Sequence, residues 1–284
     1  MGLAMKYLTK SVLFSTIVVA SAAAIAGGDL KDEHWLGRDA QSTETVNHSA
    51  WDSLLKRYIQ RDEALQLNRF DYGAVGDEDH QALKSYIDAL EAVTVTDLNP
   101  AEQKAYWINL YNAFTVDVIL DAYPVDSIRA IGGGLFSRGP WGDDDYTVTV
   151  EGRDLTLDDI EHGILRPIYD DSRVHYGVNC ASVGCPNLDR DAYTGARVDQ
   201  MLEENAQDFI ASPRGLQDIS NRGAKVSSIY HWFKEDFGGD DAGVLAHLKQ
   251  FGGSEVAERL EGVSRVRGHD YDWSLNDTAR VSTN

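Results

Sequence analysis

The chain has 284 residues, of which 43% are hydrophobic, and its formal net charge at pH 7 is −20. A chain of this length and apolar content can bury a hydrophobic core without disulfides or metals to support it. The negative charge repels phosphate backbones and anionic lipid surfaces. We therefore expect neither nucleic acid nor a charged membrane surface as a partner.

The first 26 residues have the three-part layout of a secretory signal peptide. Lys6 and Lys10 precede an apolar stretch from Val12 to Ala20, and Ala24-Ile-Ala26 is a small-residue cleavage pattern. A membrane anchor is the alternative, but this stretch is too short to span a bilayer. We expect cleavage after residue 26, export to the periplasm or beyond, and no stable membrane association afterwards.

Residues 27–97 consist of a polar segment followed by a helical segment. Residues 27–47 are polar and are expected to be poorly ordered. Residues 48–97 form the helical N-terminal part of the domain, with one helix beginning near Ser49 and a second over 77–93. The first helix has an apolar stripe of Trp51, Leu54, Leu55 and Tyr58.

A long, buried helix is predicted from Asn99 to about Ala122. Asn99 is a good N-cap, Pro100 suits the first helical position, and Glu102 has the spacing of a capping box. Apolar residues on most faces indicate a central helix. Asn109 and Asn112 lie on one side of it, and buried amides must be hydrogen-bonded. We expect them to hold a neighbouring loop or site in place.

The remainder alternates short strands and helices. We expect a flexible loop at Gly132–Gly134, a hairpin over 146–155, a helix from Thr156 to about Ile168 capped with Asp159, a core strand over 173–179, and helices over 198–210 and 243–251. These elements predict a single α+β domain with a central buried helix, a small antiparallel sheet and flanking helices. Its core spans 98–237, and residues 238–284 pack on that core as a helix and tail.

Cys180 and Cys185 are the two cysteines of the chain, and they have three interpretations. They form a structural disulfide in an oxidising compartment. Alternatively, Cys180 is a catalytic thiolate, whose pKa falls if Ala181 and Ser182 open a helix. The third interpretation is a zinc site of both cysteines with His162 and His175.

Glu161 and His162 lie on the helix before the cysteines. Glu161 aligns with the apolar face, where a carboxylate must be neutral, paired or functional. Its candidate partners are Arg166, Arg173, His175 and the thiol, and an ion pair with an arginine is the structural alternative. His162 lies on the polar face with Asp158, Asp159 and Arg166.

Several motifs together resemble the family of domains of unknown function numbered 547. They are Ala105-Tyr-Trp-Ile-Asn-Leu-Tyr-Asn-Ala113, Ile160-Glu-His162 with Arg166, Arg173-Val-His175, Asn179-Cys-Ala-Ser182 with Cys185-Pro186, Val226–Phe233 with Asp236-Phe237, and Tyr271–Asn276. The resemblance is strongest over 98–237 and implies an exported bacterial protein. Plant members carry a leucine-zipper segment, which implies an interaction role. The polar residues typical of the family are Asn109, Asn112, Glu161, His162, Arg166, Arg173, His175, Asn179, Cys180, Ser182 and Cys185.

That polar, reactive set has the composition of a functional site. We expect a cysteine-dependent hydrolase or transferase of the papain or transglutaminase type, acting on an amide or related acyl bond of a peptide or small molecule, without a cofactor. Cys180 is the predicted nucleophile, His175 the base, Glu161 its partner, His162 a competing base, and Asn179 or a backbone amide the oxyanion donor. A non-catalytic binding module with a Cys180–Cys185 disulfide is the alternative, and a zinc-binding protein the second. Trp141, Tyr230 and Trp232 belong either to the core or to a ligand groove.

Overall fold

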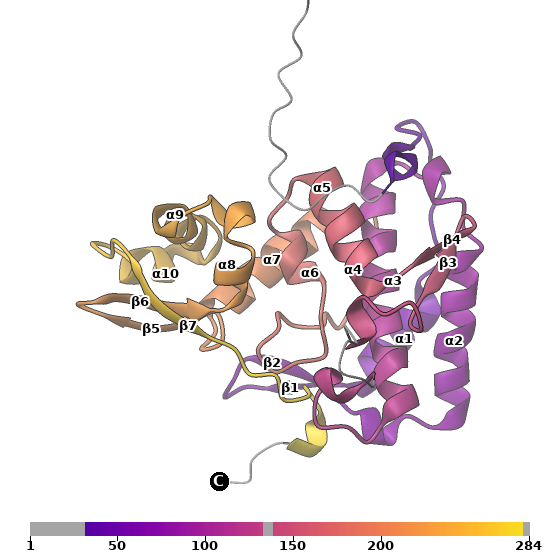
Figure 1. The fold of residues 1–284 in the computed structure, drawn as a ribbon, viewed down its shortest axis with the longest axis horizontal. Helices are drawn as coiled ribbons and strands as arrows, with labels where there is room; N and C mark the ends of the chain where they lie inside the picture. Colours follow the sequence, from indigo (N-terminus) through magenta and orange to yellow (C-terminus); the bar gives the residue numbers. More distant parts are fainter. Residues whose placement is uncertain (1–31, 133–138, 281–284) are drawn as a thin grey trace, which may run out of the picture.

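Two hydrophobic cores lie side by side in the computed structural model, which describes residues 32–132 and 139–280. Figure 1 shows the corresponding lobes, the larger one built mainly from the chain as far as Leu202 and the smaller one mainly from the residues after it. The expected signal peptide, residues 1–26, lies outside the described residues, as does most of the expected loop at 132–134. The two cores are joined through shared elements into a single α+β domain.

Helix α3 (Pro100–Ala122) is the centre of the larger core, as its all-round apolar pattern predicts. The Asn99 side chain accepts hydrogen bonds from the amides of Ala101 and Glu102 at 3.1 and 3.0 Å. The predicted capping box is wrong, because the Glu102 carboxylate turns away to the amides of Val46 and Gly195 at 2.8 and 2.9 Å. The helix start therefore also fastens two loops.

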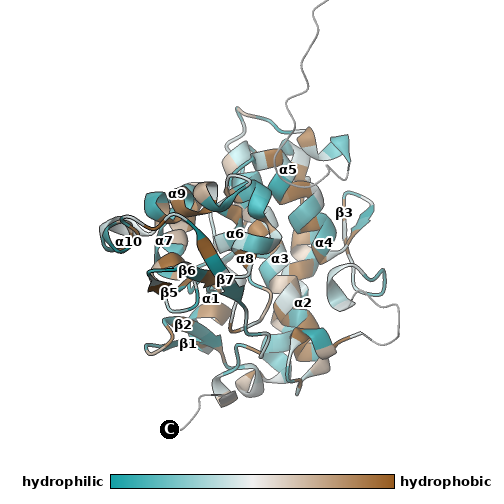
Figure 2. Cartoon of the chain, turned by 60° about the vertical axis from the view of Figure 1, so that its left-hand side comes forward, coloured by the Kyte–Doolittle hydropathy of each residue, from teal (hydrophilic) through white to brown (hydrophobic). Residues whose placement is uncertain are grey.

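Other helices surround α3. Helix α1 (Ser49–Tyr58) buries the apolar stripe that the sequence predicts, and α2 (Asp77–Glu91) buries Leu83, Tyr86, Ile87 and Leu90. Ahead of them, Trp35 from a 3-10 turn (Glu33–Leu36) is fully buried with its ring 5.0 Å from that of Trp107. Figure 2 shows hydrophilic and hydrophobic residues on the same helices, such as α5 and α9, as expected for helices with one face toward solvent.

Two antiparallel hairpins belong to the larger lobe. The first pairs β1 (Ile59–Asp62) with β2 (Leu67–Phe70), and the second pairs β3 (Val148–Val150) with β4 (Arg153–Leu155). The second is the hairpin that the sequence predicts. Its turn residues Glu151 and Gly152 have φ values of 47° and 75°, the left-handed conformation that suits glycine at the second position.

The helix that follows β4 is divided into three segments. Thr156 and Asp159 form the predicted capping box at the start of α4 (Leu157–Ile160). A π-helical segment, η6 (Glu161–Leu165), comes next, and α5 (Arg166–Tyr169) ends the stretch. π-Helical turns are rare and are found mostly at functional sites. The segment begins at two of the predicted site residues.

The predicted core strand over 173–179 is wrong: residues Val174–Gly177 form a single helical turn, α6. The alternation of Val174, Tyr176 and Val178 suggested a strand, but His175 and Gly177 between them are buried as well. When every residue of a short segment is buried, periodicity does not distinguish a strand from a helix. The residues on either side of Gly177 pack in different cores: Tyr176 in the smaller one and Val178 in the larger one.

The smaller lobe contains a three-stranded sheet. Strands β5 (Leu216–Ser220) and β6 (Gly223–Ser227) are antiparallel, whereas β7 (Val266–Asp270) pairs with β6 in parallel. Helices α9 (Asp241–Phe251) and α10 (Gly253–Arg259) pack with α7 (Val198–Ala211), and α8 (Ile229–Trp232) follows β6. Helix α7 joins the lobes, because its first half packs in the larger core and its second half in the smaller.

After β7 the chain returns to the larger lobe (Figure 1). The amide of Phe70 donates to Asn276 O at 2.9 Å, and the amide of Asn276 donates to Ala181 O at 3.0 Å. Leu275 also forms a bridge with Ser182. This C-terminal segment therefore runs beside the cysteine loop. Within the described ranges, no helix combines the length and apolar character needed to cross a bilayer.

Candidate active site

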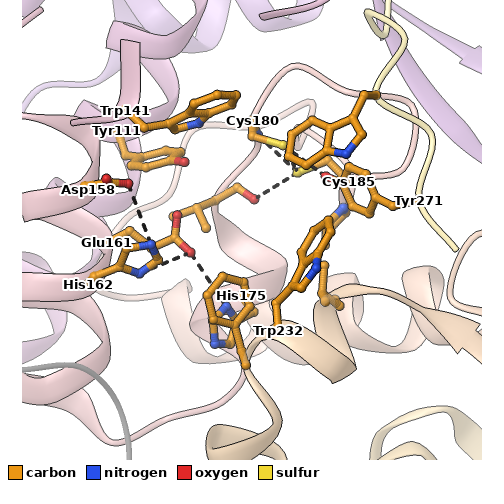
Figure 3. A pocket seen from close by; sticks show the side chains of 15 residues that line it. Tyr111, Trp141, Asp158, Glu161, His162, His175, Cys180, Cys185, Trp232 and Tyr271 are labelled. Carbon is orange, nitrogen blue, oxygen red and sulfur yellow. Dashed lines mark hydrogen bonds and ion pairs between the residues drawn. The ribbon is translucent and has the colours of Figure 1, made fainter. Parts of the chain in front are cut away.

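A pocket of about 190 Å³ lies where the two lobes meet, and both cysteines line it. The larger lobe contributes Tyr111, Trp141 and Glu161, and the smaller one contributes Phe233 and Tyr271. Figure 3 shows the sulfur atoms on one side of this pocket and the two histidines with Glu161 on the other. Ligand sites commonly lie at such junctions. The structure thus brings Cys180, Cys185, Glu161, His162 and His175 together around one cavity.

Asn109 and Asn112 hold loops, as predicted, and both are buried. The Asn109 side chain exchanges hydrogen bonds with the backbone N and O of Tyr193, at 3.0 and 2.8 Å. The Asn112 side chain accepts from the amide of Asn179 and donates to Gly177 O, both at 2.8 Å. Asn112 therefore fixes the backbone directly before Cys180 to the central helix.

The cysteine loop is a tight turn, so the condition that Ala181 and Ser182 open a helix is not met. Ala181 has a φ of 58°, and its amide donates to the Asn179 side chain at 2.9 Å. The Asn179 amide group donates in turn to Pro186 O at 2.7 Å. Asn179 is thus engaged in holding the loop, and its side chain is turned into the loop rather than into the pocket.

The two sulfur atoms are 3.1 Å apart, and both cysteines are free thiols. Cys180 is partly exposed, whereas Cys185 is only 5% exposed. The Cys185 sulfur also accepts the amide of Cys180 at 3.1 Å, and the Cys180 sulfur lies 3.0 Å from the Tyr271 hydroxyl and 3.5 Å from that of Ser182. Of the described residues, these three side chains are the hydrogen-bond partners of the Cys180 sulfur, and neither histidine is among them.

These contacts shift the pKa values of the two thiols in opposite directions. The hydrogen bond between Cys180 and Cys185, together with those between Cys180 and the side chains of Ser182 and Tyr271, lowers the pKa of Cys180 despite its desolvation and the nearby Glu161 carboxylate. Burial raises the pKa of Cys185 well above its usual value. Burial likewise raises the pKa of Tyr271, which therefore keeps its proton and acts as a donor. Cys180 is the thiol that ionises first, and Cys185 is the one that keeps its proton.

His175 is oriented by Asp236, a residue that the sequence analysis did not place in the site. The histidine Nε2 is 2.7 Å from Asp236 Oδ2, and its ring stacks on Phe233 at 4.5 Å with an interplanar angle of 22°. Arg166 donates to both Asp236 oxygens at 2.7 and 3.1 Å. Burial raises the pKa of Asp236, but the hydrogen bonds from His175 and Arg166 outweigh it and bring the pKa to about 2. Asp236 is therefore an anion that fixes the ring of His175.

Glu161 lies between the two histidines on the opposite side of the pocket from the sulfurs (Figure 3). Its Oε1 is 3.8 Å from Nδ1 of His175 and 3.8 Å from Nδ1 of His162. The structural alternative, a pair of Glu161 with an arginine, is not what forms, because Arg166 pairs with Asp236. Adjacent residues on a straight α-helix project about 100° apart, yet Glu161 and His162, at the start of the π-helical segment, both line the pocket.

Both ring nitrogens of His162 have neighbours besides Glu161. Arg166 donates toward its Nδ1 at 3.2 Å, and its Nε2 is 3.7 Å from Asp158, as the shared polar face predicts.

Arg173 lies elsewhere: it pairs with Asp171 at 2.9 Å and extends toward Asp199 and Glu203 on α7. It is not among the residues that line the pocket.

Aromatic rings form the mouth of the pocket. The ring of Trp273 lies 4.6 Å from that of Tyr271, 5.6 Å from that of Trp232 and 5.8 Å from that of Trp141. Trp232 is 44% exposed, so it presents a free surface at the entrance. Trp141 and Trp232 therefore line the groove, whereas Tyr230 is buried in the smaller core.

A buried arginine from the smaller lobe clamps the cysteine loop. Arg214 is 6% exposed and donates to the carbonyl oxygens of Val183 and Cys185, to those of Leu65 and Gln66, and to the side chain of Asn187. Burial lowers the pKa of Arg214 to about 10. On the other side, the amides of Val183 and Gly184 donate to Ser274 O and Asp272 O, both at 2.8 Å. A Cβ at Gly184 would lie 2.8 Å from Asp272 N, so this close approach requires glycine.

The candidate zinc ligands are not gathered as a set. In the described part of the chain, a cluster of three potential metal ligands forms elsewhere, from His80, Asp117 and Asp121. Their ligand atoms all lie within 4.8 Å of one another. The Lys84 ammonium lies 3.1 Å from Asp117 and 3.0 Å from Asp121, so a cation from the chain already occupies that cluster. The two cysteines contact each other but are separated by the pocket from His162 and His175 (Figure 3).

Comparison with known proteins identifies the central segment. Residues 95–210 match the family model described as "Protein of unknown function, DUF547". This segment is similar to the DUF547 family. No curated protein and no solved structure matches the chain. The DUF547 segment contains both cysteines, both histidines and Glu161, whereas Asp236 and Tyr271 complete the site from beyond its end.

Asp236 and Tyr271 were the residues most difficult to assign from sequence. Both belong to motifs that resemble the family outside the matched segment, Asp236-Phe237 and Tyr271–Asn276, and that resemblance was the available signal. Their contacts with His175 and Cys180 join residues 61 and 91 positions apart. No local spacing predicts a contact over such a separation.

Proposed function

We propose that the protein is a cysteine-dependent hydrolase or acyltransferase that acts on an amide or related acyl bond, with Cys180 as the nucleophile. The observation that supports it best is the arrangement of the pocket. A thiol of lowered pKa faces the pocket from one side, and a histidine oriented by a carboxylate faces it from the other. A substrate between them would have its acyl carbon at the sulfur and its leaving group toward the histidine.

In many cysteine enzymes a base in contact with the thiol promotes formation of the thiolate. Here the hydroxyl groups around Cys180 have that role. Once Cys180 has lost its proton, the hydroxyls of Tyr271 and Ser182, 3.0 and 3.5 Å from the sulfur, can donate to it, so the thiolate needs no histidine beside it. The thiolate attacks the acyl carbon, a C–S bond forms, and the carbonyl oxygen becomes an oxyanion. Since the sulfur is then uncharged, the Tyr271 hydroxyl is free to donate to that oxyanion.

His175 carries out the proton transfers. Asp236 accepts the Nε2 proton, so the proton that is gained and lost is the one on Nδ1. His175 protonates the leaving group as the C–N or C–O bond breaks, which leaves a thioester on Cys180. It then takes a proton from water or from an acceptor amine, which attacks the thioester and releases the product. Glu161, 3.8 Å from Nδ1, stabilises the imidazolium.

The proposal is tested with a small activated ester and reduced protein. We expect one equivalent of product in a rapid burst, followed by turnover, and an acyl adduct on Cys180 by peptide mass spectrometry. The Cys180→Ser variant should fold normally and lose the burst. The His175→Asn variant should keep the burst, because the thiolate forms without it, but stall at the thioester. An unchanged burst in Cys180→Ser refutes the nucleophile, and loss of acylation in His175→Asn refutes the division of roles.

The alternative function, a binding module with a Cys180–Cys185 disulfide, predicts other results. In that case Cys180 is inert to iodoacetamide in the native protein, and Cys180→Ala lowers the free energy of unfolding by about 2–4 kcal/mol. A zinc-binding protein would retain the metal after purification without chelators, which elemental analysis measures. The proposed location, periplasmic or extracellular, depends on residues 1–26 and is tested by N-terminal sequencing of the mature protein.

A further inference from the structure

We infer that Cys180 and Cys185 are a redox-active dithiol that reduces small hydroperoxides, with Cys180 as the residue attacked first and Cys185 as the resolving residue. This activity is separate from acyl transfer and does not depend on it. The starting observation is geometric: the sulfurs lie 3.1 Å apart and both thiols are free. A disulfide needs about 2.05 Å, so the pair has to close by about 1 Å.

The two cysteines differ in access. Cys180 is partly exposed to the pocket, whereas Cys185 is buried. A reagent that enters the pocket therefore reaches the Cys180 sulfur first. A cavity of about 190 Å³ accepts a small hydroperoxide but excludes a folded protein, so the substrate is a small molecule and not a protein disulfide. The aromatic rings at the mouth, Trp141, Trp232 and Trp273, suit an organic hydroperoxide.

The two cysteines also differ in ionisation, in the order that the reaction needs. The Cys180 sulfur lies within hydrogen-bond distance of the Tyr271 hydroxyl, the Ser182 hydroxyl and the Cys185 thiol, and each of these groups carries a proton that it can donate to a thiolate. Thiolates, and not thiols, attack peroxides. Cys185 keeps its proton because it is buried, so it does not compete with Cys180 for the oxidant.

The loop holds the dithiol in place during the reaction. Asn112 and Asn179 fix its beginning, Arg214 binds the carbonyls of Val183 and Cys185, and Gly184 packs against Asp272. The Cys185 amide also donates to Ser182 O at 3.1 Å. Since the backbone is held on both sides, the approach of the two sulfurs requires side-chain rotation alone. The disulfide can therefore form without local unfolding.

The reaction balances as follows. The Cys180 thiolate attacks the distal peroxide oxygen, the O–O bond breaks, and the alkoxide leaves and takes a proton from solvent, which gives the alcohol and a sulfenic acid. The Cys185 sulfur then attacks the Cys180 sulfur, hydroxide leaves and takes the Cys185 proton, and water is released. Two thiols and one hydroperoxide yield one disulfide, one alcohol and one water. An external dithiol restores the starting state by thiol–disulfide exchange.

The experiment uses the full-length chain after reduction and removal of the reductant, with cumene hydroperoxide as the probe. We expect two thiols to disappear for each peroxide consumed, a Cys180–Cys185 disulfide in non-reducing peptide maps, and complete recovery with dithiothreitol under native conditions. In Cys185→Ser we expect no disulfide, a dimedone adduct on Cys180 and, with excess peroxide, irreversible loss of that thiol. In Cys180→Ser, loss of the remaining thiol should be at least tenfold slower than loss of Cys180.

Three results would overturn the inference: thiols that are inert to the peroxide in the folded wild-type protein, a disulfide that dithiothreitol reduces only after unfolding, or reversible oxidation that survives in Cys185→Ser. The wild-type stoichiometry does not depend on the folding of any variant, and circular dichroism confirms the fold of both serine variants. Thiol counting needs no acyl substrate. Failure here therefore leaves the acylation burst, measured in the presence of reductant, as an independent test of the proposed function.

Discussion

Replacing Tyr271 with phenylalanine tests whether its hydroxyl group makes Cys180 acidic. The substitution removes one oxygen atom, which lies 3.0 Å from the sulfur, and leaves the ring that packs 4.8 Å from Trp232 and 4.6 Å from Trp273. A hydrogen bond to a charged group contributes about 1.5–3 kcal/mol, and one pKa unit corresponds to about 1.4 kcal/mol. We therefore expect the pKa of Cys180 to rise by about 1–2 units.

The assay is the rate of Cys180 carboxamidomethylation by iodoacetamide as a function of pH. Peptide mass spectrometry separates Cys180 from Cys185, which serves as an internal reference in the same molecule. Tyr193→Phe is the matched control, because it removes a buried hydroxyl that bonds to Asn205 at 2.6 Å and does not line the pocket. We expect its pH profile to equal that of the wild type. A wild-type midpoint in Tyr271→Phe would refute the argument that hydroxyl donors form the thiolate.

Three further predictions concern the groups around the site and the cores. Asp236→Asn removes the anion that holds His175, and we expect turnover of an ester substrate to fall by roughly 10²–10⁴ while the acylation burst persists; an unchanged turnover number contradicts the role of Asp236. Burial lowers the pKa of both His48 and His247 to about 4 from an ordinary 6.5. Their neutral forms are favoured in the folded state, so stability is fully present above pH 6.5 and is lost as the pH falls toward 4, by up to about 3 kcal/mol for each histidine. Urea titrations at pH 7 and pH 4.5 measure this, and His247→Asn should reduce the difference; equal stability at the two pH values contradicts it. Arg214→Met should cost about 2–4 kcal/mol of unfolding free energy, because it leaves the carbonyls of Val183 and Cys185 buried without a donor, and Arg214→Lys should recover part of that loss; a wild-type denaturation midpoint for Arg214→Met contradicts the clamp.

The sequence predicts those parts of the fold that depend on local signals. The start of α3 at Asn99, the hairpin before Thr156 and the capping box of α4 follow from residues a few positions apart, and the structure contains each of them. The loop-holding roles of Asn109 and Asn112 could be predicted for a similar reason. A polar amide in an otherwise apolar helix must find a partner, and the backbone of a neighbouring loop is the usual one.

The features that sequence analysis missed depend on tertiary contacts. The single turn α6 is buried on all sides, so its residues show no period that distinguishes a helix from a strand. In the π-helical segment the amide of Arg166 donates to Glu161 O, five residues back, and not four residues back as in an α-helix. No residue type signals this change in the sequence. The partners of the two central side chains, Asp236 for His175 and Tyr271 for Cys180, come from the smaller lobe and from the returning C-terminal segment.

The return of the C-terminal segment to the cysteine loop determines when the thiol becomes reactive. Tyr271 donates to Cys180, Leu275 bridges Ser182, and Asn276 accepts the side chain of Tyr72 at 2.9 Å. Tyr271 lies 91 positions after Cys180 in the sequence. Until the C-terminal segment has docked on the cysteine loop, Cys180 lacks one of the hydrogen bonds that lower its pKa. The acidity of Cys180 therefore depends on tertiary folding, and a partly folded chain carries a less acidic thiol.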